Sequence, residues 1–357
     1  MDKKDEIILQ QLDVIREMTA RNLRRVGEDV WRTPQPKKAD TGSAGKPETA
    51  GGSANAADEK GPKTASSTGQ GDSKPAEPQA PPKENIDDLK AELDSYIGLS
   101  AVKDEVRDLI NMVTVWKLRR EHDLPAPDLS LHMVFSGNPG TGKTMMARFM
   151  ARVYHSLGIL SKGHLVEVDR SGLVAGYVGQ TAIKTSSVIE KAKGGVLFID
   201  EAYSLAGETD DSYGKEAIET ILKAMEDHRD ELVVIVAGYT GLMHKFIESN
   251  PGLSSRFSKY FEYPDYTGEE LLAIFRRFCE KNGYALDQTA TDLLKRKFVE
   301  LYAGRDEHFG NARTARNIFE KAINAQADRI ALQDDISDAD LENITAQDIA
   351  VAIGGAV

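Results

Sequence analysis

The sequence predicts an α/β domain built on a parallel sheet, followed by a smaller all-helical domain. Between residues 131 and 238, short apolar runs alternate with amphipathic stretches of helical periodicity. That alternation is typical of a parallel sheet whose two faces are covered by helices. Beyond residue 266 the apolar runs stop and only helical periodicity continues. We therefore expect an α/β domain over residues 86–266 and a helical domain over residues 267–357.

The apolar runs of the first domain are expected to be buried strands, and the stretches between them helices. Strands are predicted at 131–137, 164–169, 195–200 and 231–238, with helices between them at 143–160, 181–193 and 214–228. In the second domain, helices are predicted at 268–283, 287–304, 311–332 and 345–354.

The first 85 residues differ in composition from the rest of the chain. Residues 1–32 carry arginines and an apolar stripe at helical spacing, which predicts an amphipathic helix. The stripe comprises Ile8, Leu12, Ile15, Leu23, Val26 and Val30. Residues 33–85 are rich in Pro, Gly, Ser, Ala and charge, so a disordered tether is expected, with its ends on the order of 40 Å apart. The helix could form a coiled-coil seam, dock a protein partner or fold back on the core; we favour docking to a protein partner.

Charge and cysteine content limit the partners and the compartment. The formal net charge is -12, whereas a nucleic-acid ligand needs a basic face, so nucleic acid is not expected as the main ligand. The single cysteine, Cys279, cannot form an internal disulfide, which favours a reducing compartment. No apolar run approaches the roughly 20 residues of a membrane span, and the N-terminus lacks the apolar core of a signal peptide. We expect a soluble, cytoplasmic protein.

Residues 137–144, GNPGTGKT, fit the pattern G-x-x-x-x-G-K-[ST] between a predicted strand and a predicted helix. Glycines there keep Cβ atoms away from phosphate oxygens held by backbone N–H groups, and the helix N-terminus points at the same oxygens. Lys143 is expected to reach the β- and γ-phosphates of ATP, and the Thr144 hydroxyl to complete a Mg²⁺ shell. The predicted nucleotide-binding residues of this phosphate loop are Gly137, Asn138, Pro139, Gly140, Thr141, Gly142, Lys143, Thr144 and Met145.

An acidic pair, Asp200 and Glu201, ends the apolar run GGVLFIDEAYSL. At the carboxyl end of a parallel strand, side chains face the ligand crevice. Asp200 is expected to hold the Mg²⁺ shell, and Glu201 to orient and deprotonate the attacking water. The pair could instead cap a helix, but the phosphate loop upstream favours the catalytic interpretation.

Together with GNPGTGKT and GGVLFIDEAYSL, the segments VVIVAGYTGLM, NPGLSSRF and FGNARTARNIFEKAI resemble an AAA+ ATPase of the CbxX/CfqX type. That group includes red-type Rubisco activase, the sporulation stage V protein K and the ATPase of type VII secretion. The resemblance covers residues 87–355 and leaves out the N-terminal helix and tether. It implies a homo-oligomeric ring, usually a hexamer, with ATP between subunits and a central pore that engages a protein substrate.

The resemblance also implies roles for two arginines. Arg256, in NPGLSSRF, lies where the family carries its arginine finger, which would stabilise charge on the γ-phosphate of a neighbouring subunit. Arg313, in GNAR, matches the sensor-2 arginine, which would contact the γ-phosphate from the small domain. Arg316, one turn along, is the competing candidate for sensor 2, and we favour Arg313.

The sensor-1 and adenine positions are less sharply defined. Many relatives end the fourth core strand with an asparagine, whereas this chain has VAGYTG. Thr240 occupies that place, and Tyr239 and Asn250 are the alternatives. For adenine, the segment SYIGLSAVK sits where the family packs the base, so Ile97 and Gly98 are expected to contact it, the glycine allowing close backbone approach.

The stretch GYVGQT, residues 176–181, matches the family's aromatic–aliphatic–Gly pore loop with Tyr177, Val178 and Gly179. A motor that grips unlike sequences needs non-specific apolar and stacking contacts, and flanking glycines let such a loop move. The competing interpretation is a tyrosine packed back on its own domain.

The sequence thus favours an ATP-hydrolysing ring motor that remodels or threads a protein through a pore lined by Tyr177. The alternative is a nucleotide-dependent assembly switch or scaffold with slow turnover, which Glu201 and Arg256 disfavour. A nucleic-acid motor is a third class, disfavoured by the acidic balance and the aromatic loop.

Overall fold

The computed structural model describes residues 82–125, 130–177, 179–207, 212–333 and 335–354. The predicted N-terminal helix at 1–32 and residues 33–81 of the predicted tether lie outside the described residues.

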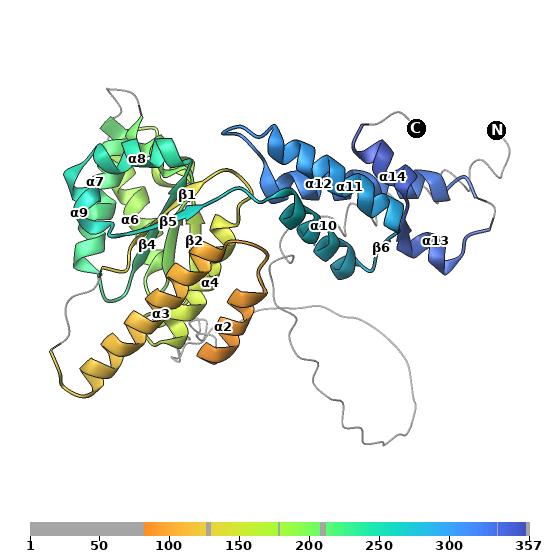
Figure 1. The fold of residues 1–357 in the computed structure, drawn as a ribbon. Coiled ribbons are helices and arrows are strands. Elements are labelled where there is room, and N and C mark those ends of the chain that lie inside the picture. The colour runs from red at the N-terminus through yellow and green to blue at the C-terminus, as the bar shows by residue number, and fades with distance from the viewer. Residues whose placement is uncertain (1–81, 126–129, 178, 208–211, 334, 355–357) are drawn as a thin grey trace, which may run out of the picture. The chain divides into compact units, whose positions relative to one another are not determined.

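A five-stranded parallel sheet forms the centre of the first domain (Figure 1). Its strands are β1 (Met133–Gly137), β2 (Leu165–Val168), β3 (Val196–Ile199), β4 (Val233–Gly238) and β5 (Lys259–Tyr263), in the order β2-β3-β4-β1-β5. The four predicted strands are confirmed, and β5 is an additional strand at the edge. Ile199 pairs with Val236 and Ser136 with Gly238, so β1, β3 and β4 end at the same edge of the sheet.

Helices cover both faces of this sheet (Figure 1). They are α2 (Ile86–Ser95), α3 (Ser100–Glu121), α4 (Lys143–Ser156), α5 (Arg170–Leu173), α6 (Gln180–Ala192), the 3-10 helix η1 (Ala202–Ala206), α7 (Ser212–Asp227), α8 (Thr240–Glu248) and α9 (Pro251–Arg256). Side chains of β1 alternate between two buried layers: Met133 and Phe135 pack with α2, α3 and α4, and Val134 packs with α6 to α9. This two-sided burial explains why β1, β3 and β4 read as nearly continuous apolar runs.

The second domain contains the four predicted helices and one further short helix. They are α10 (Gly268–Asn282), α11 (Gln288–Ala303), α12 (Asn311–Ile330), α13 (Asp338–Glu342) and α14 (Ala346–Ala352). The expectation of an all-helical domain needs one correction, because β6 (Ala285–Leu286) and β7 (Asn343–Ile344) pair in parallel. Each two-residue strand directly precedes a helix N-cap, Asp287 or Thr345, and is too short to show a period-two pattern.

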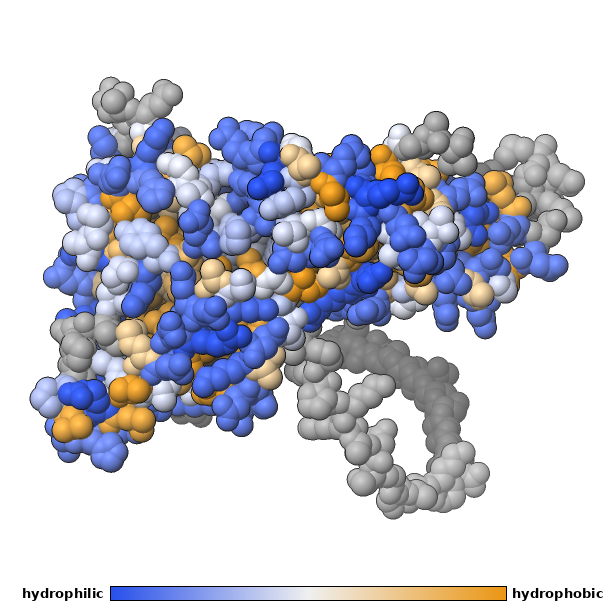
Figure 2. Space-filling model, viewed as in Figure 1, coloured by the Kyte–Doolittle hydropathy of each residue, from blue (hydrophilic) through white to orange (hydrophobic). Residues whose placement is uncertain are grey.

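The face shown in Figure 2 is mostly hydrophilic, with apolar side chains scattered among polar ones. Among the described residues, the most exposed large apolar side chains are Leu332 at 89%, Tyr177 at 73% and Ile183 at 71%. Isolated exposed apolar residues are ordinary on folded proteins. Of these three, only Tyr177 lies on a loop for which the sequence predicts a function.

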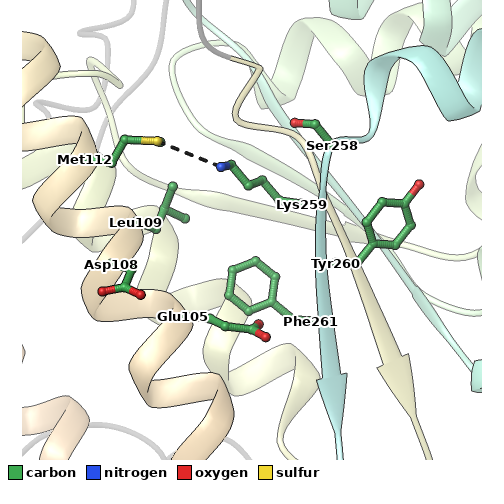
Figure 3. A pocket seen from close by; sticks show the side chains of 8 residues that line it. All are labelled: Glu105, Asp108, Leu109, Met112, Ser258, Lys259, Tyr260 and Phe261. Carbon is green, nitrogen blue, oxygen red and sulfur yellow. Dashed lines mark hydrogen bonds between the residues drawn. The ribbon is translucent and has the colours of Figure 1, made fainter.

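A groove of about 420 Å³ lies at the outer edge of the sheet, between α3 and β5 (Figure 3). It is lined by Glu105, Asp108, Leu109, Met112, Ser258, Lys259, Tyr260 and Phe261. The Lys259 ammonium lies 3.9 Å from the Met112 sulfur. Burial and the neighbouring Glu262 raise the pKa of Glu105. The groove shares no lining residue with the phosphate loop.

A buried histidine at the start of β1 makes the stability of the fold depend on pH. His132 is 5% exposed, its Nδ1 accepts from the Val234 N–H at 3.0 Å, and burial lowers its pKa to about 4. An unfolded histidine titrates near pH 6.5, so the unfolded state binds more protons between pH 6.5 and pH 4. Stability is therefore lost as pH falls through that window, by an amount on the order of 3 kcal/mol.

The variant His132→Gln keeps an acceptor and removes the titration. We expect its free energy of unfolding, measured by urea denaturation, to change less steeply with pH between pH 7 and pH 4.5 than that of the parent chain. Equal slopes for the two proteins would show that His132 does not stay neutral in the fold.

Candidate active site

The predicted phosphate loop leaves the carboxyl end of β1 and runs into α4. Gly142 is the N-cap of this 14-residue helix, and no described side chain caps its first turn. The backbone N–H groups of that turn therefore face the loop, together with the positive end of the helix dipole. Thr144 and Met145 belong to the same turn. The loop provides the geometry that phosphate oxygens require.

Two loop glycines are required by neighbouring backbone as well. Gly137 has φ +148° and a Cβ there would collide with the Tyr263 carbonyl on β5. Gly140 has φ +73°, and a Cβ there would collide with the Gly310 carbonyl, just before α12. From the sequence alone, the expected reason for these glycines is the approach of phosphate oxygens. The loop is therefore fixed from the sheet side and from the second domain.

Lys143 lies over the loop and is half-buried. Its ammonium donates to the carbonyls of Gly137 and Asn138, both at 2.8 Å. Burial lowers the pKa of Lys143 to about 8, with Arg313 also lowering it and Asp200 raising it. The charges of Asp200 and Arg313 thus act on the Lys143 ammonium in opposite directions.

Three further loop residues have structural contacts. The buried Thr141 hydroxyl donates to the Asn138 carbonyl at 2.8 Å. The Asn138 amide donates to Asp265, and the Pro139 carbonyl accepts from Asn311 at 3.3 Å. The loop is thus tied to residues of the interdomain segment and of α12.

The acidic pair follows β3 at the same sheet edge. The Asp200 carboxylate accepts from the Glu201 N–H at 3.0 Å. Glu201 has φ +49° and ψ 40°, a left-handed conformation that is unfavourable for a side chain with a Cβ. Strained backbone of this kind clusters at functional sites. The turn leaves the Glu201 side chain exposed while Asp200 is half-buried.

The three candidates for the sensor-1 residue have different surroundings in the structure. Tyr239 follows β4 and is the N-cap of α8, and Thr240 is the first residue of that helix. The Asn250 side chain is the N-cap of α9 and accepts from the Gly252 N–H at 2.8 Å. The Tyr239 ring lies between Tyr203, at 6.1 Å, and His308, at 6.0 Å.

The two sensor-2 candidates differ in their surroundings. A Cβ on Gly140 would lie 3.2 Å from the Arg313 Cγ, so Arg313 contacts the phosphate loop. Arg316 instead donates to Glu320, one turn along α12, at 3.0 Å. The structure brings Arg313, not Arg316, to the loop.

Arg256 ends α9, away from its own phosphate loop. Its guanidinium pairs with Glu226, and its carbonyl accepts from the Ser130 hydroxyl at 2.6 Å. Burial is the main cause of the low pKa of His132, and the nearby Arg256 charge lowers that pKa further. Ser130 and His132 precede β1, whereas the loop follows it, and the strand's 5 residues span about 16 Å. Arg256 therefore lies near the opposite end of β1 from the loop.

The predicted adenine contacts lie beside the start of α10. Gly98 has φ +63°, and a Cβ there would collide with Glu270, which completes the capping box of α10. Ile97 is half-buried against the core. The next residue, Leu99, lies with its Cδ1 3.7 Å from the position of a Cβ on Gly142. The segment therefore adjoins the phosphate loop.

The predicted pore loop projects from the domain. Tyr177 is 73% exposed, and added Cβ atoms at Gly176 and Gly179 would meet nothing within 4 Å. This exposure contradicts the competing interpretation, in which the tyrosine packs back on its own domain. Val178 lies outside the described residues.

Sequence reasoning did not assign a role to Asp265, Tyr266 or Asn311. The Tyr266 hydroxyl donates to the Thr141 carbonyl at 3.3 Å, and Asn311 donates to Asp265 at 2.7 Å. The available signal was the aspartate of YPDYT, which lies two residues after the end of β5, and the asparagine in the GNAR motif.

Residues 133–265 match the family described as ATPase family associated with various cellular activities (AAA), and residues 267–356 match the AAA lid domain. The chain belongs to the AAA ATPase family. It is therefore an ATPase, with the helical domain as its lid.

The chain is similar along most of its length to curated relatives. It is 39% identical over 267 residues to stage V sporulation protein K of Bacillus subtilis, covering 74% of this chain and 83% of the relative. It is 44% identical to the chromosomal protein CbxX of Cupriavidus necator, covering 74% and 84%. It is also 44% identical to the chloroplastic ribulose bisphosphate carboxylase/oxygenase activase of Cyanidioschyzon merolae, covering 74% and 90%. The predicted resemblance to the CbxX type is confirmed.

Solved structures agree on the fold. The FIGL-1 AAA domain in complex with ADP superposes with a TM-score of 0.50 at 22% identity, covering 77% of this chain and 93% of that one. None of the helices within the described ranges is long and apolar enough to span a membrane.

Proposed function

We propose that this ATPase works as a homo-oligomeric ring, with six subunits, that remodels or threads a protein substrate through a pore lined by Tyr177, Val178 and Gly179. The observation that carries the proposal is the 73% exposed Tyr177 ring on a glycine-flanked loop. A large aromatic side chain that is mostly exposed suits non-specific contact with an unfolded polypeptide. One relative is named as an activase of another enzyme, ribulose bisphosphate carboxylase/oxygenase. That name supports a protein as the substrate class.

In hydrolysis, Lys143 and the N–H groups of the α4 N-terminus hold the β- and γ-phosphates of ATP. Glu201 takes a proton from the water that attacks the γ-phosphorus, and the bond from phosphorus to the β–γ bridging oxygen breaks, giving ADP and phosphate. Arg313 contacts the γ-phosphate from the lid. Thr240 is the proposed sensor-1 residue, and Ile97 and Gly98 border the adenine.

The residues present fit a Mg²⁺ ion. A hydroxyl, Thr144, and a carboxylate, Asp200, are the hard oxygen donors that this ion prefers alongside nucleotide phosphates. Within the described residues, no group of three or more His, Cys, Asp or Glu side chains could hold a metal alone. Mg²⁺ bound there would neutralise charge on the phosphates.

The position of Arg256 supports a shared site. Because Arg256 lies near the start of β1 and the phosphate loop near its end, this arginine acts on the nucleotide of a neighbouring subunit. That arrangement needs a head-to-tail ring. We also propose that residues 1–32 dock a protein partner and that the ring acts in the cytoplasm.

A cysteine at position 177 tests whether the loop lies on a ring axis. The chain's single cysteine, Cys279, is buried and its pKa is raised to about 12, so it does not react. We expect Tyr177→Cys, combined with Glu201→Gln and ATP to hold the ring, to form inter-subunit adducts with a short bis-maleimide on denaturing gels.

The matched control is Leu332→Cys, because Leu332 is 89% exposed but lies on the lid. We expect it to give no inter-subunit adducts. If Tyr177→Cys also gives none while light scattering shows the assembled ring, the pore assignment is wrong and the assembly switch is the better account.

A further inference from the structure

Asp265 lies at the junction between the AAA domain and the lid and is the acceptor of a small, partly buried network. Its carboxylate is 16% exposed. The Asn138 amide donates to its Oδ1 at 3.0 Å and its Oδ2 at 3.2 Å, and the Asn311 amide donates to Oδ1 at 2.7 Å. Hydrogen bonds to an ionised acceptor are stronger than neutral ones. One carboxylate thus binds the phosphate loop and the lid together.

Asn311 is suited to this place by its own chemistry. It is fully buried, and its φ of +48° is one that asparagine tolerates better than most residues. Its Nδ2 is shared among Asp265, the Phe309 carbonyl at 3.0 Å and the Pro139 carbonyl at 3.3 Å. Its Oδ1 accepts from the Tyr266 N–H at 2.8 Å. Only a side chain that both donates and accepts satisfies these groups.

The network holds the start of α12 against the phosphate loop. Gly310, the N-cap of α12, offers no side-chain cap, and the Ala312 N–H instead donates to the Gly140 carbonyl at 3.2 Å. The phosphate loop therefore caps the lid helix. Arg313 is the next residue, so its position relative to the phosphates is set by the same contact.

We infer that Asp265, Asn138 and Asn311 are positioning residues that aim Arg313 at the γ-phosphate and couple the phosphate loop to the lid; this rests on the proposed role of Arg313. Asn138 and Gly140 belong to the loop, and Asn311 and Ala312 to α12. A shift of the loop on nucleotide exchange is therefore transmitted to the lid through direct hydrogen bonds. Arg305, 3.5 Å from Asp265 and 39% exposed, adds little.

The test compares ATP with ADP, because only ATP carries the γ-phosphate. In the Glu201→Gln background, which keeps ATP intact, we expect Asp265→Asn to weaken ATP binding about tenfold relative to ADP binding. Asn138→Ala, which removes the loop's own donor to Asp265, should change the ratio in the same direction. Asp292→Asn, an exposed aspartate on α11, is the matched control and should leave the ratio unchanged. Titration calorimetry measures both affinities.

Combination with Arg313→Ala separates this inference from the proposed function. We expect Arg313→Ala to lower the ATP-to-ADP affinity ratio, and Asp265→Asn to lower it no further in that background. If Arg313→Ala lowers the ratio but neither Asp265→Asn nor Asn138→Ala does, the positioning role is wrong and the role of Arg313 stands. If Arg313→Ala leaves the ratio unchanged, both are overturned.

Discussion

The Glu201→Gln variant is expected to hydrolyse ATP at least about 100-fold more slowly than the parent chain. The substitution keeps the size of the side chain and removes the carboxylate that accepts the proton of the attacking water. Lys143 and the α4 N-terminus are untouched, so ATP affinity should stay near that of the parent chain. Phosphate release and titration calorimetry measure the two quantities.

The neighbouring carboxylate provides the control. We expect Asp200→Asn to weaken the Mg²⁺ dependence of ATP binding, because Asp200 is a proposed ligand of that ion. If Glu201→Gln retained near-normal turnover, the left-handed turn after β3 would be a structural feature of the fold, and the general base would have to be found elsewhere.

The Arg256→Ala variant is expected to lose about 1,000-fold in turnover with little change in ATP affinity. A guanidinium from a neighbouring subunit stabilises charge that develops only as the γ-phosphoryl group leaves, so its removal affects the rate far more than binding. Steady-state hydrolysis at protein concentrations where light scattering shows assembly is the appropriate measurement.

Glu226→Gln is the matched control, since it removes the ion-pair partner of Arg256 and keeps the guanidinium. A surface pair with one partner 70% exposed contributes little to stability, so we expect turnover close to that of the parent chain. Equal losses in Arg256→Ala and Glu226→Gln would mean that the ion pair, and not catalysis, is what Arg256 provides.

The parts of the fold that could be predicted are those for which a single short segment of sequence is enough to indicate the structure. The phosphate loop and the acidic pair depend on neighbours in sequence, and β1, β3 and β4 are apolar on both faces. The strand β5 was missed because it is an edge strand in which only Phe261 and Tyr263 are buried. The other residues of the strand are Lys259, Tyr260 and Glu262, so β5 contains no continuous apolar run.

The Asp265 network could not be predicted, because its contacts join residues far apart in sequence. Asn138 and Asp265 are 127 residues apart, and Asp265 and Asn311 are 46 apart. Only the folded arrangement of loop, junction and lid helix brings them together. The sensor-1 position remained ambiguous for the same reason, although the Asn250 side chain, as the N-cap of α9, already has a structural hydrogen bond.

The most direct test of a shared ATP site mixes two inactive proteins, Glu201→Gln and Arg256→Ala. In a mixed ring, roughly a quarter of the interfaces pair a site that retains Glu201 with a neighbour that retains Arg256. We predict that mixing restores ATP hydrolysis well above the sum of the two separate proteins. If light scattering shows mixed rings and hydrolysis stays at that sum, Arg256 does not act on the neighbour's nucleotide, and the account of a ring with shared sites is contradicted.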